Sequence, residues 1–337
     1  MDSVIYLFRG FFVLSVCLSA YSVITRRKER TEEDRLMAEE KLYTLIQQYF
    51  PSELQQSLLR YESLFSEVQE IRCRIERPLV LRLRQNREQI AAERLTAHQL
   101  HHIVDRITQG SVYAWEEEFR QGYLTLRGGH RVGLAGKGVL EHGRIRTLKQ
   151  ISGLNFRIAR SIPGAAERLI PHVVEHGRLR NTLQISPPGC GKTTKLRDQI
   201  CQLSDGIPEQ KFAGVNIGVV DERSELAGCV NGIPQLAIGM RTDVLDGCPK
   251  SEGIRMMIRS MGPQAVAADE IGSEADIAAL EEALQSGVAI LTTAHGNGLQ
   301  DVLHHPVLKH LVLQGYFTVI ASLRWEHGQI AKTLERG

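Results

Sequence analysis

One short segment of the chain combines glycines with a lysine and two threonines. It consists of Ser186, Pro187, Pro188, Gly189, Cys190, Gly191, Lys192, Thr193 and Thr194. The spacing is that of the pattern Gly-x4-Gly-Lys-Thr, with Ser186 at the first glycine position. An apolar strand is expected before the segment and a helix after it. Backbone N–H groups of such a loop surround a phosphate, and the helix N-terminus adds the positive end of its dipole. The segment therefore predicts a phosphate-binding loop.

Two residues of this loop would have separate tasks. The Lys192 ammonium would neutralise charge on the β- and γ-phosphates, and the Thr193 hydroxyl would hold Mg²⁺. Ser186 is small, and Gly189 and Gly191 still permit close approach of the backbone to a phosphate. A glycine-rich turn before an ordinary helix is the alternative interpretation, and the Lys-Thr-Thr run directly after glycine argues against it. The predicted ligands are ATP and Mg²⁺.

Polar residues also follow two later apolar runs. A strand expected over 265–268 ends in Asp269 and Glu270, and one over 289–293 leads to His295. Asp269 would contact Mg²⁺ or its bound water, and Glu270 would take a proton from the attacking water. Thr293 and His295 would lie where a side chain senses the γ-phosphate. An Asp-Glu pair is usually a solvated helix cap and a lone histidine is usually structural, but their order after the loop favours one shared site.

The patterning divides the chain into two domains. Residues 41–150 read as a small α+β domain, with alternating strands over 68–84, a helix over 96–107 and a hairpin turn at 128–130. Residues 151–325 read as α/β. Apolar strands over 182–185, 215–220, 265–268 and 289–293 alternate there with helices, which is typical of a parallel sheet. Ligands of such sheets bind at the carboxyl ends of the strands. After an interrupted helix near Pro306, a last strand is expected over 319–323, and residues 326–337 form a tail.

The N-terminus is apolar. Residues 10–25 carry no charge and are followed by Arg26, Arg27 and Lys28. This stretch is shorter than the roughly 20 residues of a spanning helix, although 4–24 would reach that length if Arg9 snorkels. The basic cluster would keep the following chain in the cytoplasm. Three interpretations stay open: a membrane anchor, a mistaken start before a soluble protein that begins near Met37, and a cleaved signal peptide. Residues 26–40 form a charged linker.

Composition restricts the class of protein. A chain of 337 residues with 42% hydrophobic and 24% charged residues has the content of a globular protein with a core. A net charge of +2 gives no general attraction to nucleic acid. Six scattered cysteines without a CxxC pair argue against a zinc site and fit a reducing cytosol. Six arginines over 72–87 leave a nucleic-acid-dependent ATPase as an alternative, although interleaved aromatic residues are missing. A non-hydrolysing, nucleotide-binding scaffold for a membrane complex is a third function.

Several motifs spread over 42–323 carry a family resemblance. They are residues 113–118, 121–123, 128–136, 152–160, 186–197, 220–228, 242–250, 258–261 and 269–272. With these, the chain resembles the stage III sporulation AA family, ATPases of the bacterial secretion (type II and type IV pilus) superfamily. The resemblance implies a RecA-like P-loop ATPase domain with a parallel sheet, preceded by a small α+β domain.

The resemblance also implies a function and partners. Relatives form homo-hexameric rings with nucleotide at the subunit boundaries. The expected activity is that of a Mg²⁺-dependent, ATP-hydrolysing motor at the cytoplasmic face of the membrane. It would power assembly of, or transport through, the channel between mother cell and forespore during endospore formation. Membrane proteins of that channel would be its partners, and specific nucleic acid would not.

Further site residues follow from the resemblance. Asp221, Glu222 and Glu225 match an acidic box, which makes Glu222 a second candidate for the general base. His295 matches a histidine box. Arg157 and Arg160 match arginines that reach the nucleotide and would stabilise charge on the γ-phosphoryl group. A solvated strand edge is the alternative interpretation for both arginines.

Overall fold

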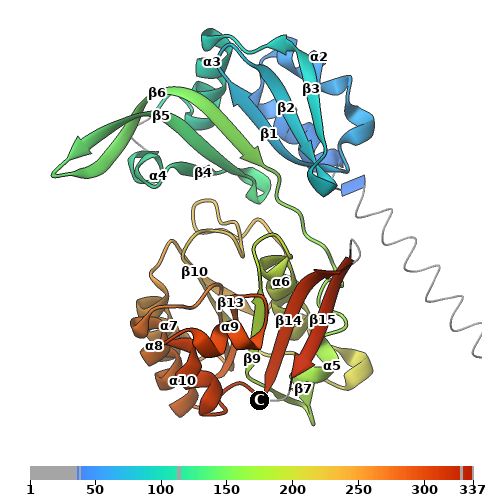
Figure 1. The fold of residues 1–337 in the computed structure, drawn as a ribbon, viewed down its shortest axis with the longest axis vertical. Helices are drawn as coiled ribbons and strands as arrows, with labels where there is room; N and C mark the ends of the chain where they lie inside the picture. Colours follow the sequence, from blue (N-terminus) through green and yellow to red (C-terminus); the bar gives the residue numbers. More distant parts are fainter. Residues whose placement is uncertain (1–35, 38, 112–114, 327–328, 336–337) are drawn as a thin grey trace, which may run out of the picture. The chain divides into compact units, whose positions relative to one another are not determined.

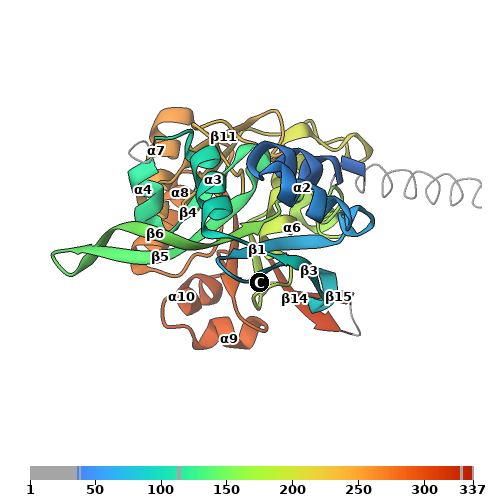
Figure 2. The same ribbon diagram turned by 90° about the horizontal axis from the view of Figure 1, so that it is seen from above.

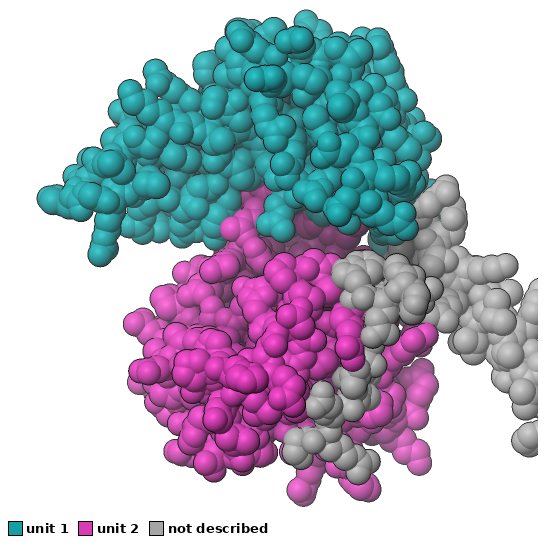
Figure 3. Space-filling model, viewed as in Figure 1, with its two compact units in different colours: residues 1–123, 133–158 teal, residues 124–132, 159–337 magenta. Residues whose placement is uncertain are grey.

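The computed structural model describes residues 36–37, 39–111, 115–326 and 329–335. They belong to two compact units: unit 1 is residues 1–123 and 133–158, and unit 2 is residues 124–132 and 159–337 (Figure 3). The apolar segment at 4–24 and most of the charged linker lie outside the described residues, as do residues 113–114 of one family motif. Within the described ranges, no helix combines the length and the apolar character needed to cross a bilayer.

Unit 1 is built on a sheet with the strand order β3-β2-β1-β6-β5-β4 (Figure 1). The pairs β1–β2, β2–β3 and β1–β6 are antiparallel. The strands are β1 Val68–Arg74, β2 Pro78–Leu83, β3 Glu88–Arg94, β4 Tyr123–Thr125, β5 Arg131–Glu141 and β6 Arg144–Arg157. The helices are residues 39–49, α2 Ser52–Leu59, α3 Ala97–Thr108 and α4 Glu116–Gln121, with short 3-10 turns η1 Glu62–Leu64, η2 Arg84–Asn86 and η4 Arg127–Gly129.

Alternation of buried and exposed residues explains the strands of this unit, and a capping box explains the start of α3. Ile71 and Cys73 are buried while Arg72 between them is partly exposed, so the predicted period of two is confirmed. Thr96 and Gln99 form a capping box at the start of α3. The predicted helix over 96–107 is therefore confirmed, and its buried face contains Leu100, Ile103, Val104 and Ile107.

One hairpin of unit 1 extends beyond the rest of its sheet. β5 and β6 project together in both ribbon views (Figures 1 and 2). The two residues between them, His142 and Gly143, have φ values of 50° and 75°. Two consecutive left-handed residues are typical of a tight type I′ hairpin turn. Side chains near the tip, such as Leu140 and Ile145, are exposed.

Unit 2 contains a seven-stranded sheet of order β11-β10-β12-β13-β9-β14-β15. All neighbouring pairs from β11 to β14 are parallel, and only β15 pairs antiparallel. The strands are β9 Thr182–Ser186, β10 Ile217–Asp221, β11 Thr242–Asp246, β12 Ala265–Ala268, β13 Ala289–His295, β14 Val319–Glu326 and β15 Gln329–Glu335. The other elements are α5 Ile170–Val173, β7 Val174–Glu175, β8 Arg178–Leu179, α6 Lys192–Asp205, η5 Pro208–Gln210, α7 Lys250–Met261, α8 Glu274–Gln285, α9 Leu299–His304 and α10 Leu308–Leu313.

Helices cover both faces of this sheet. Val219 belongs to the apolar cluster under α6, whereas the next residue, Val220, belongs to the cluster under α7, α8 and α10. Because successive strand residues point to opposite faces, strands buried on both sides read as continuous apolar runs. The predicted α/β fold, a RecA-like parallel sheet after a small α+β domain, is confirmed.

Three strands of unit 2 differ from the sequence predictions. β11 was not predicted, because it lies at the sheet edge, is only partly buried and has the polar sequence Thr-Asp-Val-Leu-Asp. The last strand was expected over 319–323. β14 includes that range but continues to Glu326, and β15 follows within the stretch expected to be a tail. The predicted break near Pro306 is confirmed, since α9 ends at His304 and α10 begins at Leu308.

Candidate active site

The predicted phosphate-binding loop joins β9 to α6. Gly189 and Gly191 have φ values of 79° and 74°, in the region where residues with a Cβ atom are strained. A Cβ atom on Gly189 would meet no atom within 4 Å, so this backbone faces open space. No side chain caps α6 at Gly191, which leaves the first N–H groups of the helix for a ligand. Ser186 is fully buried and its hydroxyl donates to the Pro187 carbonyl at 3.1 Å.

Lys192 lies beside two of the predicted catalytic residues. Its Nζ is 2.5 Å from Glu270 Oε1 and 3.2 Å from His295 Nε2. His295 Nε2 is in turn 2.9 Å from the same Glu270 oxygen. The Lys192 side chain is only 8% exposed, so the lysine end of this ion pair is largely shielded from water, whereas the Glu270 side chain is 28% exposed. The structure thus brings together three residues that are separated by up to 103 positions in the chain.

The environment of Glu270 keeps it ionised. Burial alone would raise the pKa of this carboxyl group. The hydrogen bond from Lys192 and the positive charges of Lys192, His295 and Arg223 together outweigh burial, so the pKa lies below its ordinary value. Arg223 Nη1 is 3.8 Å from the second Glu270 oxygen. The carboxyl group is therefore in the deprotonated form that a general base requires.

Thr193 and Asp269 form the second contact of the site. Thr193 Oγ1 donates to Asp269 Oδ2 at 2.6 Å. Thr193 is the second residue of α6, and Asp269 directly follows β12. Both residues therefore lie at the carboxyl edge of the parallel sheet. A hydroxyl and a carboxylate are hard oxygen donors, the kind that suits Mg²⁺. Thr293, expected near the γ-phosphate, is instead fully buried behind Asp269.

The three carboxylates of the acidic box have different environments. Asp221 is 3% exposed and accepts the backbone N–H groups of Glu225, Leu226 and Ala227 at 2.8–3.0 Å. It therefore holds the turn after β10. Glu222 forms an ion pair with Lys250 at the start of α7 and lines a small pocket of about 50 Å³ with Asp269 and Glu270. Glu225 pairs with Arg131 within unit 2.

Arg197 was missed by the sequence analysis. It lies on α6, is 7% exposed, and donates to the carbonyls of Leu226, Glu225 and Arg160 at 2.5, 2.6 and 3.2 Å. Burial lowers the pKa of this guanidinium, although the negative charges of Asp221, Asp269 and Glu225 act to raise it. Because its partners are backbone oxygens of distant loops, no sequence pattern reveals them. Arg197 ties the 225–226 turn to the helix that begins at the phosphate-binding loop.

Replacing Arg197 with methionine is expected to destabilise unit 2. The apolar side chain keeps most of the packing but leaves three carbonyls without their donor, at a cost of about 3 kcal/mol in the free energy of unfolding. Urea denaturation followed by circular dichroism measures this. The matched control is Arg255→Met on α7, because Arg255 pairs with Glu282 at the surface. Equal shifts in the two midpoints would contradict a special role for Arg197.

The two arginines expected to reach the nucleotide lie in different units. Arg157 ends β6 in unit 1, is exposed, and lies opposite Glu70 in the strand register. Arg160 belongs to unit 2, is partly buried, and its carbonyl accepts from Arg197. The action of both arginines on a nucleotide remains a prediction.

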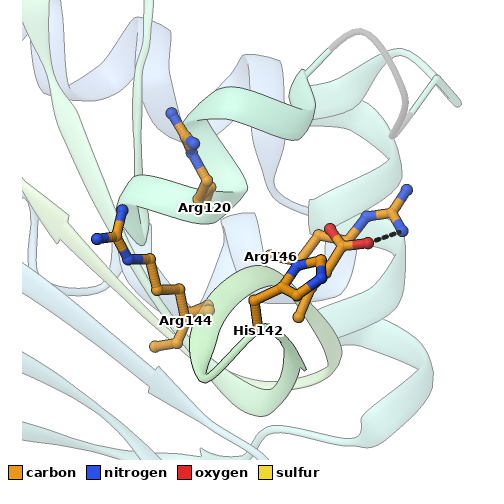
Figure 4. A pocket seen from close by; sticks show the side chains of 6 residues that line it. Arg120, His142, Arg144 and Arg146 are labelled. Atoms are coloured by element: carbon orange, nitrogen blue, oxygen red, sulfur yellow. Dashed lines mark hydrogen bonds and ion pairs between the residues drawn. The ribbon is translucent and has the colours of Figure 1, made fainter.

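A larger pocket lies elsewhere, in unit 1. It has a volume of about 490 Å³ between α4 and the β5–β6 hairpin, and its lining includes Arg120, His142, Arg144 and Arg146 (Figure 4). Acidic residues of the same region already neutralise much of this charge. Arg146 lies 3.6 Å from Glu116 and 3.5 Å from Glu141, and Arg120 lies 2.5 Å from Glu117. None of the predicted catalytic or loop residues lines this pocket.

The chain is similar to proteins of known sequence and structure. Stage III sporulation protein AA of Bacillus subtilis (strain 168) is 46% identical over 250 residues, which are 74% of this chain and 80% of that protein. The ATPase DotB of Legionella pneumophila aligns with a TM-score of 0.54 and 14% identity, over 86% of this chain and 81% of DotB. The pilus retraction motor PilT, solved with ADP, aligns with a TM-score of 0.52 and 14% identity, over 83% and 82%.

At 14% identity the two structures establish the fold alone. The sequence relationship goes further, because a family model described as "Sporulation stage III, protein AA" matches residues 39–334, nearly the whole described chain. The chain therefore belongs to the sporulation stage III protein AA family.

Proposed function

We propose that this protein is a Mg²⁺-dependent ATPase that works as a motor in sporulation. One observation carries the proposal: Lys192, Thr193, Asp269 and Glu270 meet at the carboxyl edge of a parallel sheet, with Thr193 Oγ1 2.6 Å from Asp269. In P-loop ATPases, phosphate, metal ion and attacking water are handled at this edge. The ATPase DotB and the pilus retraction motor PilT, which was solved with bound ADP, support nucleotide use by the shared fold.

The residues present fit a magnesium ion. Thr193 and Asp269 supply two hard oxygen ligands, and Mg²⁺ in nucleotide sites takes its remaining ligands from phosphates and water. When bound, Mg²⁺ would neutralise charge on the β- and γ-phosphates. Gly189 and Gly191 would bring backbone N–H groups close to the phosphates, and Lys192 would add its positive charge.

Glu270 would act as the general base. It would take a proton from a water molecule as that oxygen attacks the γ-phosphorus and the bond to the ADP oxygen breaks. In the structure the Glu270 carboxylate contacts Lys192 and His295. Phosphate entry would draw Lys192 toward the new negative charge and leave Glu270 able to bind water. The products would be ADP and inorganic phosphate.

Family membership supports the biological role. We expect the ATPase to form a homo-hexameric ring that powers assembly of, or transport through, the mother cell–forespore channel, together with membrane proteins of that channel. A nucleic-acid-dependent activity is less well supported. In the arginine-rich stretch, Arg72 and Arg82 contact Glu70, and Arg87 contacts Glu67, so much of the basic surface is already neutralised.

The test is steady-state phosphate release by the full chain with Mg²⁺-ATP over a series of protein concentrations. Activity per mole of protein should rise with concentration, because a ring shares its sites between subunits. Stimulation by single-stranded nucleic acid would favour the alternative activity. ATP binding without phosphate release at any concentration would favour a non-hydrolysing scaffold and contradict the proposal.

Arg157→Ala tests for a site shared between subunits. If Arg157 stabilises γ-phosphoryl charge, turnover should fall about 100-fold while ATP affinity changes less than about threefold. The control is Arg74→Ala, another exposed arginine at a strand end of unit 1. Mixing the Arg157→Ala and Lys192→Ala proteins should restore part of the activity, since some sites would combine both intact residues. Unchanged turnover would support a solvated strand edge, and Arg160→Ala would then be tested in the same way.

A further inference from the structure

Thr293 occupies the strand between the two halves of the candidate site. β13 pairs on one side with β9, which leads into the phosphate-binding loop, and on the other with β12, which leads into Asp269 and Glu270. The Thr293 side chain has no exposed surface. It is therefore enclosed behind the site and does not line it.

The Thr293 hydroxyl forms hydrogen bonds with both acidic residues. Its Oγ1 donates to Asp269 Oδ1 and accepts the backbone N–H of Glu270 at 2.9 Å. The Thr293 carbonyl accepts the N–H of Ile271 at 3.1 Å. A threonine hydroxyl can donate one hydrogen bond, and here the Asp269 carboxylate accepts it. A hydroxyl that is already committed in this way is not available to a γ-phosphate.

The Asp269 carboxylate is consequently held from both sides. Thr293 binds Oδ1 and Thr193 binds Oδ2, at 2.6 Å for the latter. Hydrogen bonds to both oxygens fix the rotation of the carboxylate about its last side-chain bond. A metal ligand held in this way is oriented before the metal arrives.

The backbone of Glu270 is also held in an uncommon conformation. Its φ is 54°, in the left-handed region that glutamate rarely adopts. This conformation turns the chain sharply after Asp269 and directs the Glu270 side chain to Lys192 and His295. The bond from the Glu270 N–H to Thr293 Oγ1 ties the turn to the neighbouring strand.

We propose that Thr293 is a positioning residue whose single hydroxyl sets the Asp269 carboxylate and the Glu270 turn together. The proposal rests on the proposed ATPase function for its catalytic consequence. It replaces the expectation that Thr293 senses the γ-phosphate directly. Thr293 acts through the two acidic residues and contacts neither nucleotide nor attacking water.

The first test compares three variants of the full chain. Thr293→Val removes the hydroxyl at nearly constant volume and Thr293→Ser retains it. Thr292→Val is the matched control, because Thr292 is equally buried but donates to the Ala268 carbonyl at 2.7 Å. Thr293→Val should lower turnover about 100-fold and raise the Mg²⁺ concentration for half-maximal activity about 10-fold, with the KM for ATP changed less than about threefold. Thr293→Ser and Thr292→Val should stay within about threefold of the unmodified protein in all three quantities.

The second test needs neither nucleotide nor activity. Residue-resolved hydrogen exchange of the nucleotide-free protein should show the Glu270 amide exchanging at least about 10-fold faster in Thr293→Val. The Ile271 amide, which is bonded to the Thr293 carbonyl, should keep its rate, as should both amides in Thr292→Val. If the unmodified protein releases no phosphate, the ATPase proposal fails, and the exchange rates alone decide the positioning of Glu270.

Either of two results would overturn the proposal. The first is an unchanged Glu270 exchange rate in Thr293→Val. The second is an equal loss of turnover in Thr293→Val and Thr292→Val without a shift in Mg²⁺ dependence, which would indicate general loss of packing.

Discussion

Replacing Lys192 with alanine is expected to weaken ATP binding by at least about 100-fold, because a shielded ammonium paired with phosphate oxygens contributes several charge-assisted hydrogen bonds. The Lys192 side chain is 8% exposed and lies at the start of α6, where the loop backbone turns at Gly191. Removing it also removes the cation that lowers the pKa of Glu270, so that pKa should rise. A fluorescent ATP analogue measures the affinity in a titration with Mg²⁺ present.

Lys195→Ala is the matched control for this substitution. Lys195 lies one turn further along α6, carries the same charge, and donates to the Ala165 carbonyl at 3.2 Å rather than facing the loop. Its removal should change ATP affinity less than about threefold. Equal affinities of the unmodified and Lys192→Ala proteins would remove the basis for a phosphate-binding loop at residues 186–194.

Glu270→Gln should separate binding from turnover. The amide retains the size of the side chain but cannot take up a proton, so hydrolysis should slow about 100- to 1,000-fold. ATP affinity should be unchanged or higher, because glutamine does not compete with phosphate for Lys192 as the carboxylate does. Single-turnover phosphate release and nucleotide titration together measure the two quantities.

Glu222→Gln provides the comparison, since Glu222 is the second candidate for the general base and lines the same small pocket. Its ion pair with Lys250 occupies it in the structure, and we expect turnover to fall less than about 10-fold. A full rate in Glu270→Gln combined with a slow rate in Glu222→Gln would assign the proton transfer to Glu222.

The sequence predicted those parts of the site that depend on local pattern. The loop at 186–194, the Asp-Glu pair after β12 and His295 after β13 each follow a buried apolar run, and such runs are visible as patterns in the sequence. Because the strands are parallel, their carboxyl ends lie at one edge of the sheet, so the position of these residues in the fold follows from the strand predictions alone. The α+β character of the first unit followed in the same way from alternation and caps.

The remaining features depend on contacts between distant residues. β11 is an edge strand with partly exposed polar residues, so it has neither a continuous apolar run nor a clear alternation. Asp221 resembles its acidic neighbours in sequence, yet it is used internally to bind three backbone N–H groups. Arg197 is one of several charged residues on α6, and only the folded chain supplies its carbonyl partners. Residues 124–132 are grouped with unit 2 although their chain neighbours on both sides belong to unit 1.

The ion pair between Lys192 and Glu270 has a consequence for the energetics of the reaction cycle. Since Lys192 already has a negative partner, binding of ATP would replace the Glu270 carboxylate with phosphate oxygens. The affinity for ATP would then reflect the difference in free energy between these two pairings. Such an exchange should depend less steeply on ionic strength than neutralisation of a free lysine would. In the proposed cycle the same carboxylate would compete for Lys192 again after hydrolysis, so re-formation of the Lys192–Glu270 ion pair would assist release of ADP and phosphate.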